Sequence, residues 1–386
     1  MIHTIRNARI VTTDSEFIGS FCYEDKNTDK NTDQIITDVY SGNAGLAGTD
    51  WEGDFLLPGL IEIHTDNLEK HLMPRPKVSW PILPAIAAHD AQIAASGITT
   101  VLDAIAIGDI DTDSLRMQTL HASIQGLQTA ANAGILRADH FLHLRLELAE
   151  PKLIEMFTPF LQDHRLKLVS LMDHTPGQRQ WTNLQHYRTY VTGKRGWTNE
   201  KVDGMLAHLL ERQHTHAAAN RREVVRLCRE LATPIPLASH DDTTLNHVNQ
   251  GVLEGVSMSE FPTTLAAAQA AREHQLSIIM GAPNVVRGGS HSGNVSAKDL
   301  AKVDLLDVLS SDYVPASLLH AAFLLQESGV SLPKAIATVT SNPAKILGMH
   351  DRGEITKGFR ADFIRVRIVE NFPIIIGVWK TGRQIW

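Results

Sequence analysis

Eight stretches of strand-forming residues recur through the middle of the chain, and this alternation constrains the fold more than any other feature. They cover residues 55–64, 97–104, 140–149, 166–174, 233–242, 255–262, 275–284 and 305–315. Helical patterns separate several of them, for example residues 86–97, 220–231 and 261–274. Eight alternating units predict an α/β fold, a (β/α)8 TIM barrel. An open doubly wound sheet is the competing architecture, but no strand–GxGxxG–helix motif opens the chain, which weakens a dinucleotide-binding version of it.

The two ends of the chain follow a different pattern. Residues 5–12 and 34–42 are predicted strands, and the polar repeat between them, with DKNT twice in tandem, predicts an exposed loop. The C-terminal end has glycine turns followed by an alternating strand. We therefore expect a small β-sandwich domain built from residues 1–55 and 343–386, with the hydrolase barrel in residues 56–342.

Composition limits the classes of protein that this chain can belong to. Hydrophobic residues make up 43% and charged residues 20%, which is typical of a globular protein, and no apolar run approaches the roughly 20 residues of a membrane span. The net charge of −7 disfavours a general nucleic-acid binder. Cys22 and Cys228 are too few for a disulfide framework or a cysteine zinc site, and they fit a reducing cytoplasm. We expect a cytoplasmic protein without nucleic-acid or membrane partners, and leave a homo-oligomer open.

Polar residues stand at the ends of the predicted barrel strands, where TIM barrels carry their active sites. In the first strand Ile61 and Ile63 share one face, and His64 lies on the opposite face with its polar neighbours. Histidine nitrogens and carboxylate oxygens suit Zn²⁺, Mn²⁺ or Fe²⁺, so these strand ends predict a metal site. The ligand-type residues are His64, Asp66, Glu147, Asp173, His174, His240, Asp241, Asp242, Glu260 and Asp312.

Each of these residues also has a structural interpretation. A single His at a strand end is more often a hydrogen-bonded structural residue than a ligand, and an Asp before a turn, such as Asp241, Asp242 or Asp312, is usually a cap. Glu147 could pair with Arg145. These structural interpretations are less convincing for the whole set than for each residue alone, because five strand ends of one predicted barrel carry residues of ligand type.

Taken together, the residues resemble the amidohydrolase superfamily. The resemblance covers essentially the whole chain: Pro58-Gly59 and His64-Thr65-Asp66 at the first strand, then His174, His240 and Asp312, and finally Asn342-Pro343-Ala344 followed by Gly353, Gly358, Ala361 and Asp362. Many members carry His-x-His in the first strand, whereas here Asp66 stands where the second His would be. The resemblance implies a metal-dependent hydrolase barrel with a small β domain.

Longer segments are similar to one branch of that superfamily, the diphosphatases of bacterial phosphonate use in the carbon–phosphorus lyase pathway. The segments are residues 64–71, 74–81, 173–180, 239–242, 259–264, 280–294 and 310–319. The similarity implies that the substrate is a triphosphorylated ribose phosphonate. Hydrolysis within the triphosphate would release pyrophosphate and leave a 5-phosphate on the ribose.

The resemblance also implies roles for individual residues and two divalent ions per chain, with Zn²⁺ expected first and Mn²⁺ or Fe²⁺ as alternatives. His64 and Asp66 would occupy the ligand positions of the first strand. Glu147 would bridge the two ions, and His174 and His240 would bind the second. Asp312 would contact metal and, as the catalytic residue, accept the proton of the attacking water.

A pyrophosphate leaving group needs charge stabilisation, so cations and polar loops after the strands are candidates for holding phosphate. The loop after the seventh strand contains Gly288 and Gly289, and such loops form nests of backbone N–H groups, although a plain surface loop is the commoner fate of such a stretch. The candidates are Asn67, Lys70, His71, Arg75, Arg179, Glu260, Arg287, Ser290, His291 and Asn294, whereas Arg188, Lys194 and Arg195 are expected to be surface charges.

Two other functions remain open from the residues. The same barrel and metals could hydrolyse a cyclic amide or deaminate an aminopurine, a reaction that needs fewer cations than a polyphosphate substrate. A catalytically inactive barrel that serves as an assembly partner is the second alternative. The presence of all the ligand-type residues argues against an inactive barrel.

Overall fold

The computed structural model describes residues 1–25, 34–42, 45–75, 78–109, 115–179, 192, 198–289 and 294–386. The tandem DKNT repeat and the charges at Arg188, Lys194 and Arg195 lie outside these residues, so those expectations stay predictions. Among the described residues, no helix combines the length and the apolar character that a membrane span requires.

The barrel predicted from the sequence is confirmed. Eight strands pair in chain order from β6 to β13, and the pairings with a defined register are parallel. They are β6 (Leu60–Thr65), β7 (Ile98–Ile107), β8 (Asp139–Glu147), β9 (Leu166–Met172), β10 (Leu237–His240), β11 (Met258–Glu260), β12 (Ser277–Gly281) and β13 (Val308–Ser310). Each strand overlaps one of the eight predicted stretches, and β6, β7 and β8 extend beyond theirs by one to three residues.

Helices follow most of the barrel strands, as the alternating pattern predicts. The α-helices are α1 (Asn67–Leu72), α2 (Ile82–Ala95), α3 (Leu115–Asn132), α4 (Leu153–Phe157), α6 (Asn199–Arg212), α7 (Ala218–Arg229), α8 (Leu245–Leu253), α9 (Leu265–Glu273), α10 (Ala282–Arg287), α11 (Ala297–Lys302), α12 (Ser317–Leu324), α13 (Leu332–Ala337) and α14 (Ser341–Ile346). Short 3₁₀ segments cover Thr158–Phe160 and Leu325–Ser328, and a π-helical turn, Gln213–Ala217, joins α6 to α7.

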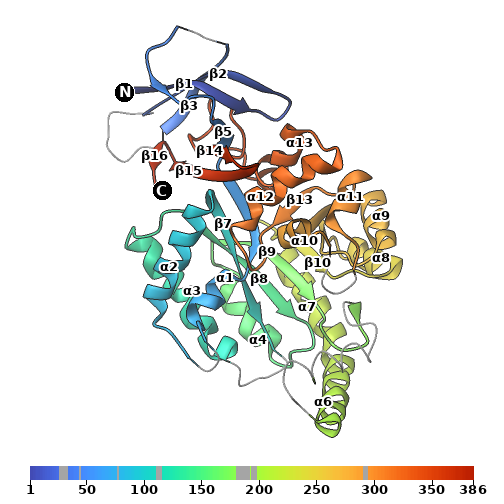
Figure 1. Cartoon of the computed structure of the whole chain (residues 1–386). Helices are drawn as coiled ribbons and strands as arrows, with labels where there is room; N and C mark the ends of the chain where they lie inside the picture. The colour runs from blue at the N-terminus through green and yellow to red at the C-terminus, as the bar shows by residue number, and fades with distance from the viewer. Residues whose placement is uncertain are drawn as a thin grey trace. The chain divides into compact units, whose positions relative to one another are not determined.

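A mixed sheet combines strands from both ends of the chain (Figure 1). Its central strands pair β14 with β5 and β5 with β1, so the C-terminal part of the chain lies beside the N-terminal part. The sheet packs over an aromatic core in which Phe363 stacks on Trp379 with ring centroids 5.0 Å apart. Its strands are β1 (Ile2–Val11), β2 (Glu16–Asp25), β3 (Gln34–Ser41), β4 (Thr49–Asp50), β5 (Phe55–Pro58), β14 (Phe363–Val369), β15 (Phe372–Lys380) and β16 (Arg383–Gln384).

The first predicted strand, residues 55–64, is divided between the two sheets. β5 belongs to the mixed sheet and β6 to the barrel, with Gly59 between them. The Gly59 N–H donates to the Asp362 carbonyl oxygen, 2.9 Å away, and a Cβ at this position would overlap with the Thr99 side chain. Glycine is therefore required here for close backbone approach, and it marks the change of sheet.

Backbone hydrogen bonds between the end of β6 and Asp312, two residues after β13, close the barrel. The Asp312 N–H donates to the His64 carbonyl oxygen at 3.1 Å, and the Asp66 N–H donates to the Asp312 carbonyl oxygen at 3.2 Å. The Thr65 hydroxyl donates to the same Asp312 oxygen at 2.7 Å. The closure thus joins residues at opposite ends of the barrel sequence.

The chain divides into two compact units. The first unit comprises Met1–Asp103, Gln125–Phe141 and Met280–Trp386, and the second comprises Ala104–Ile124 and Leu142–Ile279. The expected boundary between a small β domain and the barrel stays a prediction.

In the first unit, Asp139 at the start of β8 anchors the C-terminal part of the chain. Its carboxylate accepts hydrogen bonds from Arg352 at 2.8 Å and Lys380 at 2.9 Å, and it pairs with Arg360 at 2.9 Å. Burial alone would raise the pKa of Asp139, but the charges of these three partners and the hydrogen bond from Lys380 hold it well below its usual range. The charged form of Asp139 therefore contributes to the stability of the fold.

Candidate metal centre

The C-terminal ends of four successive barrel strands bring polar side chains together in the second unit. Glu147 ends β8, His174 follows β9, His240 ends β10 and Glu260 ends β11. Asp241 comes directly after β10. All five stand at the rim where TIM barrels carry their active sites.

Glu147 fixes the orientation of His174. One carboxylate oxygen of Glu147 accepts a hydrogen bond from Nδ1 of His174 at 2.8 Å, and the other accepts from the His174 backbone N–H at 3.1 Å. Since a carboxylate can only accept, Nδ1 carries the proton and the lone pair of a neutral His174 lies on Nε2. The structure therefore places both oxygens of Glu147, a predicted bridging ligand, on His174.

Glu260 acts on His240 in the same way. Its Oε2 accepts from Nδ1 of His240 at 2.7 Å, so the ring lone pair again lies on Nε2. The His174 and His240 rings meet edge to face, with centroids 5.6 Å apart. Two imidazoles thus present Nε2 atoms from neighbouring strands.

Both Nε2 atoms face Asp241. Oδ2 of Asp241 lies 3.8 Å from Nε2 of His174 and 3.6 Å from Nε2 of His240. Two ring lone pairs beside a buried carboxylate repel one another, and a cation removes that repulsion. In agreement, burial would lower the pKa of His174, but the charge and hydrogen bond of Glu147 and the charge of Asp241 raise it. The donor set fits a divalent metal of the Zn²⁺, Mn²⁺ or Fe²⁺ type.

Arg179 forms hydrogen bonds with residues at the end of β10, next to this cluster. Its guanidinium donates to the Asp242 carboxylate at 2.5 Å, to the His240 carbonyl oxygen at 2.7 Å and to the Ser239 hydroxyl at 3.2 Å. Arg179 and Asp242 are both buried. Arg179, a predicted phosphate-binding residue, is therefore occupied with the end of β10.

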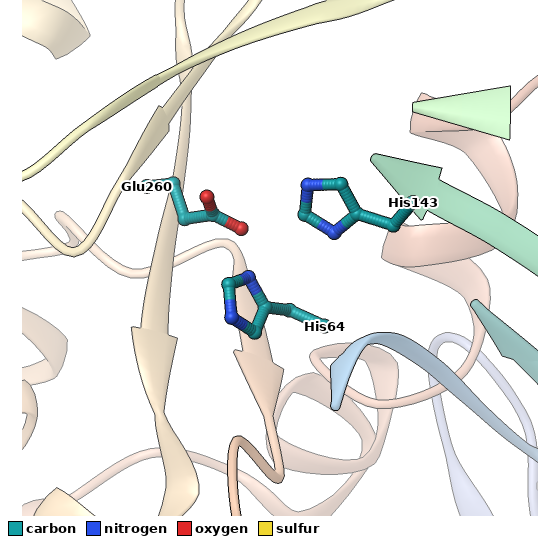
Figure 2. A group of neighbouring side chains, drawn as sticks. All are labelled: His64, His143 and Glu260. Atoms are coloured by element: carbon teal, nitrogen blue, oxygen red, sulfur yellow. The ribbon is translucent and has the colours of Figure 1, made fainter. Parts of the chain in front are cut away.

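Glu260 also takes part in hydrogen bonds that connect β8, β9 and β11. The Ser170 hydroxyl on β9 donates to Oε2 of Glu260 at 2.8 Å, and Nε2 of His143 on β8 lies 2.5 Å from the same hydroxyl. Figure 2 shows the His143 ring and the Glu260 carboxylate directed toward one another, with His64 of β6 also drawn. Three fully buried side chains thus share one chain of hydrogen bonds.

In the first unit, the end of β6 and the residues after β13 carry the other predicted ligands. His64 is buried on β6, Asp66 follows the strand, and Asp312 has a left-handed backbone with φ of 52°. Between them lies Glu62, whose carboxylate accepts from the backbone N–H groups of His64 and Ser311, each at 2.6 Å. Burial raises the pKa of Glu62 to about 7, although these hydrogen bonds act in the opposite direction. Glu62 therefore stabilises the seam of the barrel.

A buried network also lies in the first unit, beyond the predicted site. His89 and His140 each contact one oxygen of Asp103, at 2.7 Å and 2.8 Å, and Nε2 of His140 lies 3.3 Å from Asp90. Burial would lower the pKa of His140, but the charges and hydrogen bonds of Asp103 and Asp90 raise it to about 9. Burial lowers the pKa of His89. A protonated His140 between two aspartates offsets part of their negative charge.

Among the described residues, ligand-type atoms gather in a set within each unit. The ligand atoms lie within 4.8 Å of one another in the set His174, His240 and Asp241 of the second unit, and in the set His89, Asp103 and His140 of the first. Only in the former do ring lone pairs face a carboxylate. We therefore take the cluster of His174, His240 and Asp241, with its partners Glu147 and Glu260, as the candidate metal centre.

The structure places the remaining predicted phosphate-binding residues as follows. Asn67 is buried, and its amide nitrogen contacts Nδ1 of His89 and Oε1 of Gln92, each at 3.0 Å. His71 also contacts Gln92, at 2.9 Å, and Lys70 donates to the Tyr313 carbonyl oxygen. The side chains of Arg75 and Arg287 are exposed and that of Asn294 is half-buried, whereas Ser290 and His291 lie outside the described residues.

Two contributors to this centre, Asp241 and Ser170, are not among the metal ligands predicted from the sequence, although Asp241 is one of the ligand-type residues at the strand ends. Asp241 was interpretable as a turn cap, and its backbone φ of 56° cannot be read from the sequence. Ser170 lies inside a hydrophobic strand and gives no pattern of its own. A polar residue at a fully buried strand position was the available indication in the case of Ser170.

Comparisons with known proteins agree with this description. A family model described as "Amidohydrolase family" matches residues 82–368. The alpha-D-ribose 1-methylphosphonate 5-triphosphate diphosphatase of Escherichia coli (strain K12) is 47% identical over 340 residues, which cover 87% of this chain and 89% of that protein. An adenine deaminase of Deinococcus radiodurans is 35% identical over 102 residues, covering 24% of this chain and 19% of the deaminase.

Solved structures of the same fold are more distant in sequence. A variant of N-acetyl-D-glucosamine-6-phosphate deacetylase from Mycobacterium smegmatis aligns with a TM-score of 0.63 at 13% identity, covering 100% of this chain and 99% of the deacetylase. Dihydropyrimidinase from Brevibacillus agri aligns with a TM-score of 0.61 at 13% identity, covering 100% and 95%. At this level of identity the likeness concerns the fold alone.

Proposed function

The chain belongs to the amidohydrolase family, and from that premise we propose that it is a metal-dependent diphosphatase of phosphonate catabolism by the carbon–phosphorus lyase pathway. It hydrolyses alpha-D-ribose 1-methylphosphonate 5-triphosphate to the 5-phosphate and pyrophosphate. The observation that carries this function is the identity of 47% to a diphosphatase of that name over 87% of the chain. The imidazole and carboxylate groups of the candidate metal centre supply the donors that such a hydrolase needs.

We further propose that the chain binds two divalent ions, with zinc expected first and manganese or iron as alternatives. The proposed ligands are His64, Asp66, Glu147, His174, His240 and Asp312, to which the geometry adds Asp241. When bound, the ions would supply an activated water near neutral pH and charge compensation for the phosphoryl oxygens. The cation-demanding arrangement of His174, His240 and Asp241 supports this proposal.

The side chains of the protein have distinct tasks in this proposal. Asp312 accepts the proton of the attacking water, and its backbone, bonded to His64 and Asp66, holds the carboxylate at a fixed place on the rim. Lys70, Arg75 and Arg287 have exposed side chains, which makes their positive charges available to the phosphates of the substrate. The two buried cysteines, both free, support a reducing cytoplasm as the location of the protein.

Phosphorus NMR of the reaction products tests this function. The purified chain is stripped of metal, reloaded with Zn²⁺ or Mn²⁺, and given the ribose triphosphate. We expect equal amounts of pyrophosphate and the ribose 5-phosphate product, and no turnover by the metal-free protein. Release of orthophosphate from the γ position, or a loaded protein that leaves the triphosphate intact, contradicts the proposal.

Hydrolysis of a cyclic amide or deamination of an aminopurine is the second candidate. One observation favours it, the identity of 35% to an adenine deaminase, but that match covers 24% of the chain. The same metal-loaded protein is therefore assayed with adenine and with a dihydropyrimidine. Turnover of either without turnover of the triphosphate would favour the second candidate. Metal binding without turnover of any substrate would favour an inactive assembly partner.

A further inference from the structure

Glu260 contacts His240, a candidate metal ligand, and Ser170, a buried side chain of the second unit. Its Oε2 accepts from Nδ1 of His240 at 2.7 Å and from the Ser170 hydroxyl at 2.8 Å. Its side chain is fully buried at the end of β11. An oxygen that receives two hydrogen bonds inside the protein has a fixed place, and it fixes the groups that donate to it.

The directions of the hydrogen bonds follow from the chemistry of the groups. Ser170 has one hydroxyl proton, which it donates to Glu260, so its oxygen can only accept from His143. Nε2 of His143, 2.5 Å from that oxygen, is therefore the donor. His143 Nε2–H therefore donates to the Ser170 oxygen, and the Ser170 hydroxyl donates to Glu260. Nδ1–H of His240 also donates to Glu260. We call these four residues the β8–β11 relay.

This direction determines the tautomer of His240. With its proton held on Nδ1 by Glu260, the ring keeps its lone pair on Nε2, the atom that faces Asp241. A ring that turned over would lose the bond to Glu260 and place a carbon toward Asp241. Outer groups that orient a metal-binding histidine in this way are worth 10- to 100-fold in metal affinity.

We propose that Glu260 is a positioning residue for metal binding, and that Ser170 and His143 act through it on His240. This inference deepens the proposed function, since it names the side chains that prepare one ligand. It gives Glu260 a task different from the substrate contact expected from the sequence. His143, Ser170 and Glu260 lie on β8, β9 and β11, so the strands of the barrel hold the His240 ring in its orientation.

Co²⁺ titration of the metal-free, full-length protein tests the proposal, with the visible absorption of Co²⁺ and calorimetry as readouts. We expect Glu260→Gln and Glu260→Ala to lower Co²⁺ affinity by 10- to 100-fold and to change the absorption spectrum. Ser170→Ala and His143→Gln, which act through Glu260, are expected to lower affinity severalfold with an unchanged spectrum. Ser259→Ala, a fully buried neighbour on β11, is the matched control and should bind Co²⁺ like the wild type.

Three results would overturn the proposal. Affinity within twofold of wild type in both Glu260 variants excludes a positioning role. A loss of affinity in the Glu260 variants with wild-type binding in Ser170→Ala and His143→Gln makes Glu260 a direct ligand and removes the relay. A raised KM with unchanged Co²⁺ affinity makes Glu260 a substrate contact. Because the Co²⁺ titration needs no substrate, a failure of the proposed function appears only in the turnover assay and leaves the comparisons of Co²⁺ affinity valid.

Discussion

Asp241 combines a strained backbone with a position between two imidazoles. A left-handed φ in a residue other than glycine costs about 1–3 kcal/mol and persists where surrounding structure enforces it. The Asp241 N–H donates to the Glu260 carbonyl oxygen at 2.9 Å, which holds the residue in this conformation. In this conformation the Asp241 carboxylate lies beside Nε2 of both His174 and His240.

Replacement of Asp241 by Asn is expected to remove metal and to spare the fold. Asn tolerates the left-handed conformation, so the turn survives, but the negative charge between the imidazoles is lost. We expect the Asp241→Asn protein to bind about one ion fewer and to lose roughly 100-fold in turnover. Elemental analysis and circular dichroism check this. A full metal complement in the variant would show that Asp241 is not a ligand.

Asp312→Asn is expected to separate proton transfer from metal binding. The backbone of Asp312 makes the bonds that close the barrel, and these remain in the amide variant. Loss of a general base typically costs on the order of 10²–10⁴ in rate. We expect turnover to fall below detection while the metal content stays near that of the wild type. Loss of both ions in this variant would instead make Asp312 mainly a ligand.

At the scale of elements, the loop after β9 is held to the end of β10 by Arg179. Its guanidinium bonds Asp242 and the backbone of His240, and the Thr243 hydroxyl donates back to the Arg179 carbonyl oxygen at 3.0 Å. These contacts are made inside the protein. The ends of two neighbouring strands, and with them His174 and His240, therefore depend on one buried ion pair.

Arg179→Gln is expected to destabilise the fold by about 3 kcal/mol, because it leaves the buried carboxylate of Asp242 without its charged partner. Arg287→Gln, on an exposed side chain, is the matched control and should change stability by less than about 0.5 kcal/mol. Urea denaturation measures both. Equal stabilities of the two variants would show that Arg179 is free to serve the substrate, as the sequence suggested.

The elements that are easiest to predict are those whose residues follow a period. All eight barrel strands overlap the predicted stretches because alternating strands and helices leave a strong hydrophobic pattern. The division at Gly59 was not predicted, since apolar residues stand on both sides of Pro58-Gly59 and both halves are buried. Arg179 is predicted to bind phosphate from its charge, but its pairing with Asp242 could not be predicted, because a sequence does not show which partner neutralises a side chain.

At the scale of the whole molecule, Asp139 makes stability depend on pH. Its pKa is depressed in the folded protein, so its contribution is present above the unfolded pKa, ordinarily 3.8, and is lost as the pH falls through the lower folded value. Asp139→Asn is expected to cost about 3 kcal/mol at pH 7, and the difference from wild type should shrink below about pH 4. Urea denaturation at both pH values measures this. A difference that is the same at both would exclude the charge of Asp139 as the cause.

The fold and the ligand types were accessible from the sequence, but the pairing of the side chains was not. His174 and His240 could be placed at strand ends, since strand periodicity is local. Their orientation by Glu147 and Glu260 depends on which strands become neighbours and on which ring nitrogen carries the proton. Both are properties of the assembled barrel.

The seam of the barrel has a consequence for how the protein is made. Thr65 and Asp312 are 247 positions apart in the chain, yet the hydrogen bonds between them close the barrel. Asp312 is also the proposed proton acceptor. A nascent chain on the ribosome therefore lacks both its closure and its catalytic carboxylate until the last barrel strand has been synthesised. If Asp312 is the proton acceptor, as proposed, a product that ends before residue 312 lacks that group and would not hydrolyse substrate.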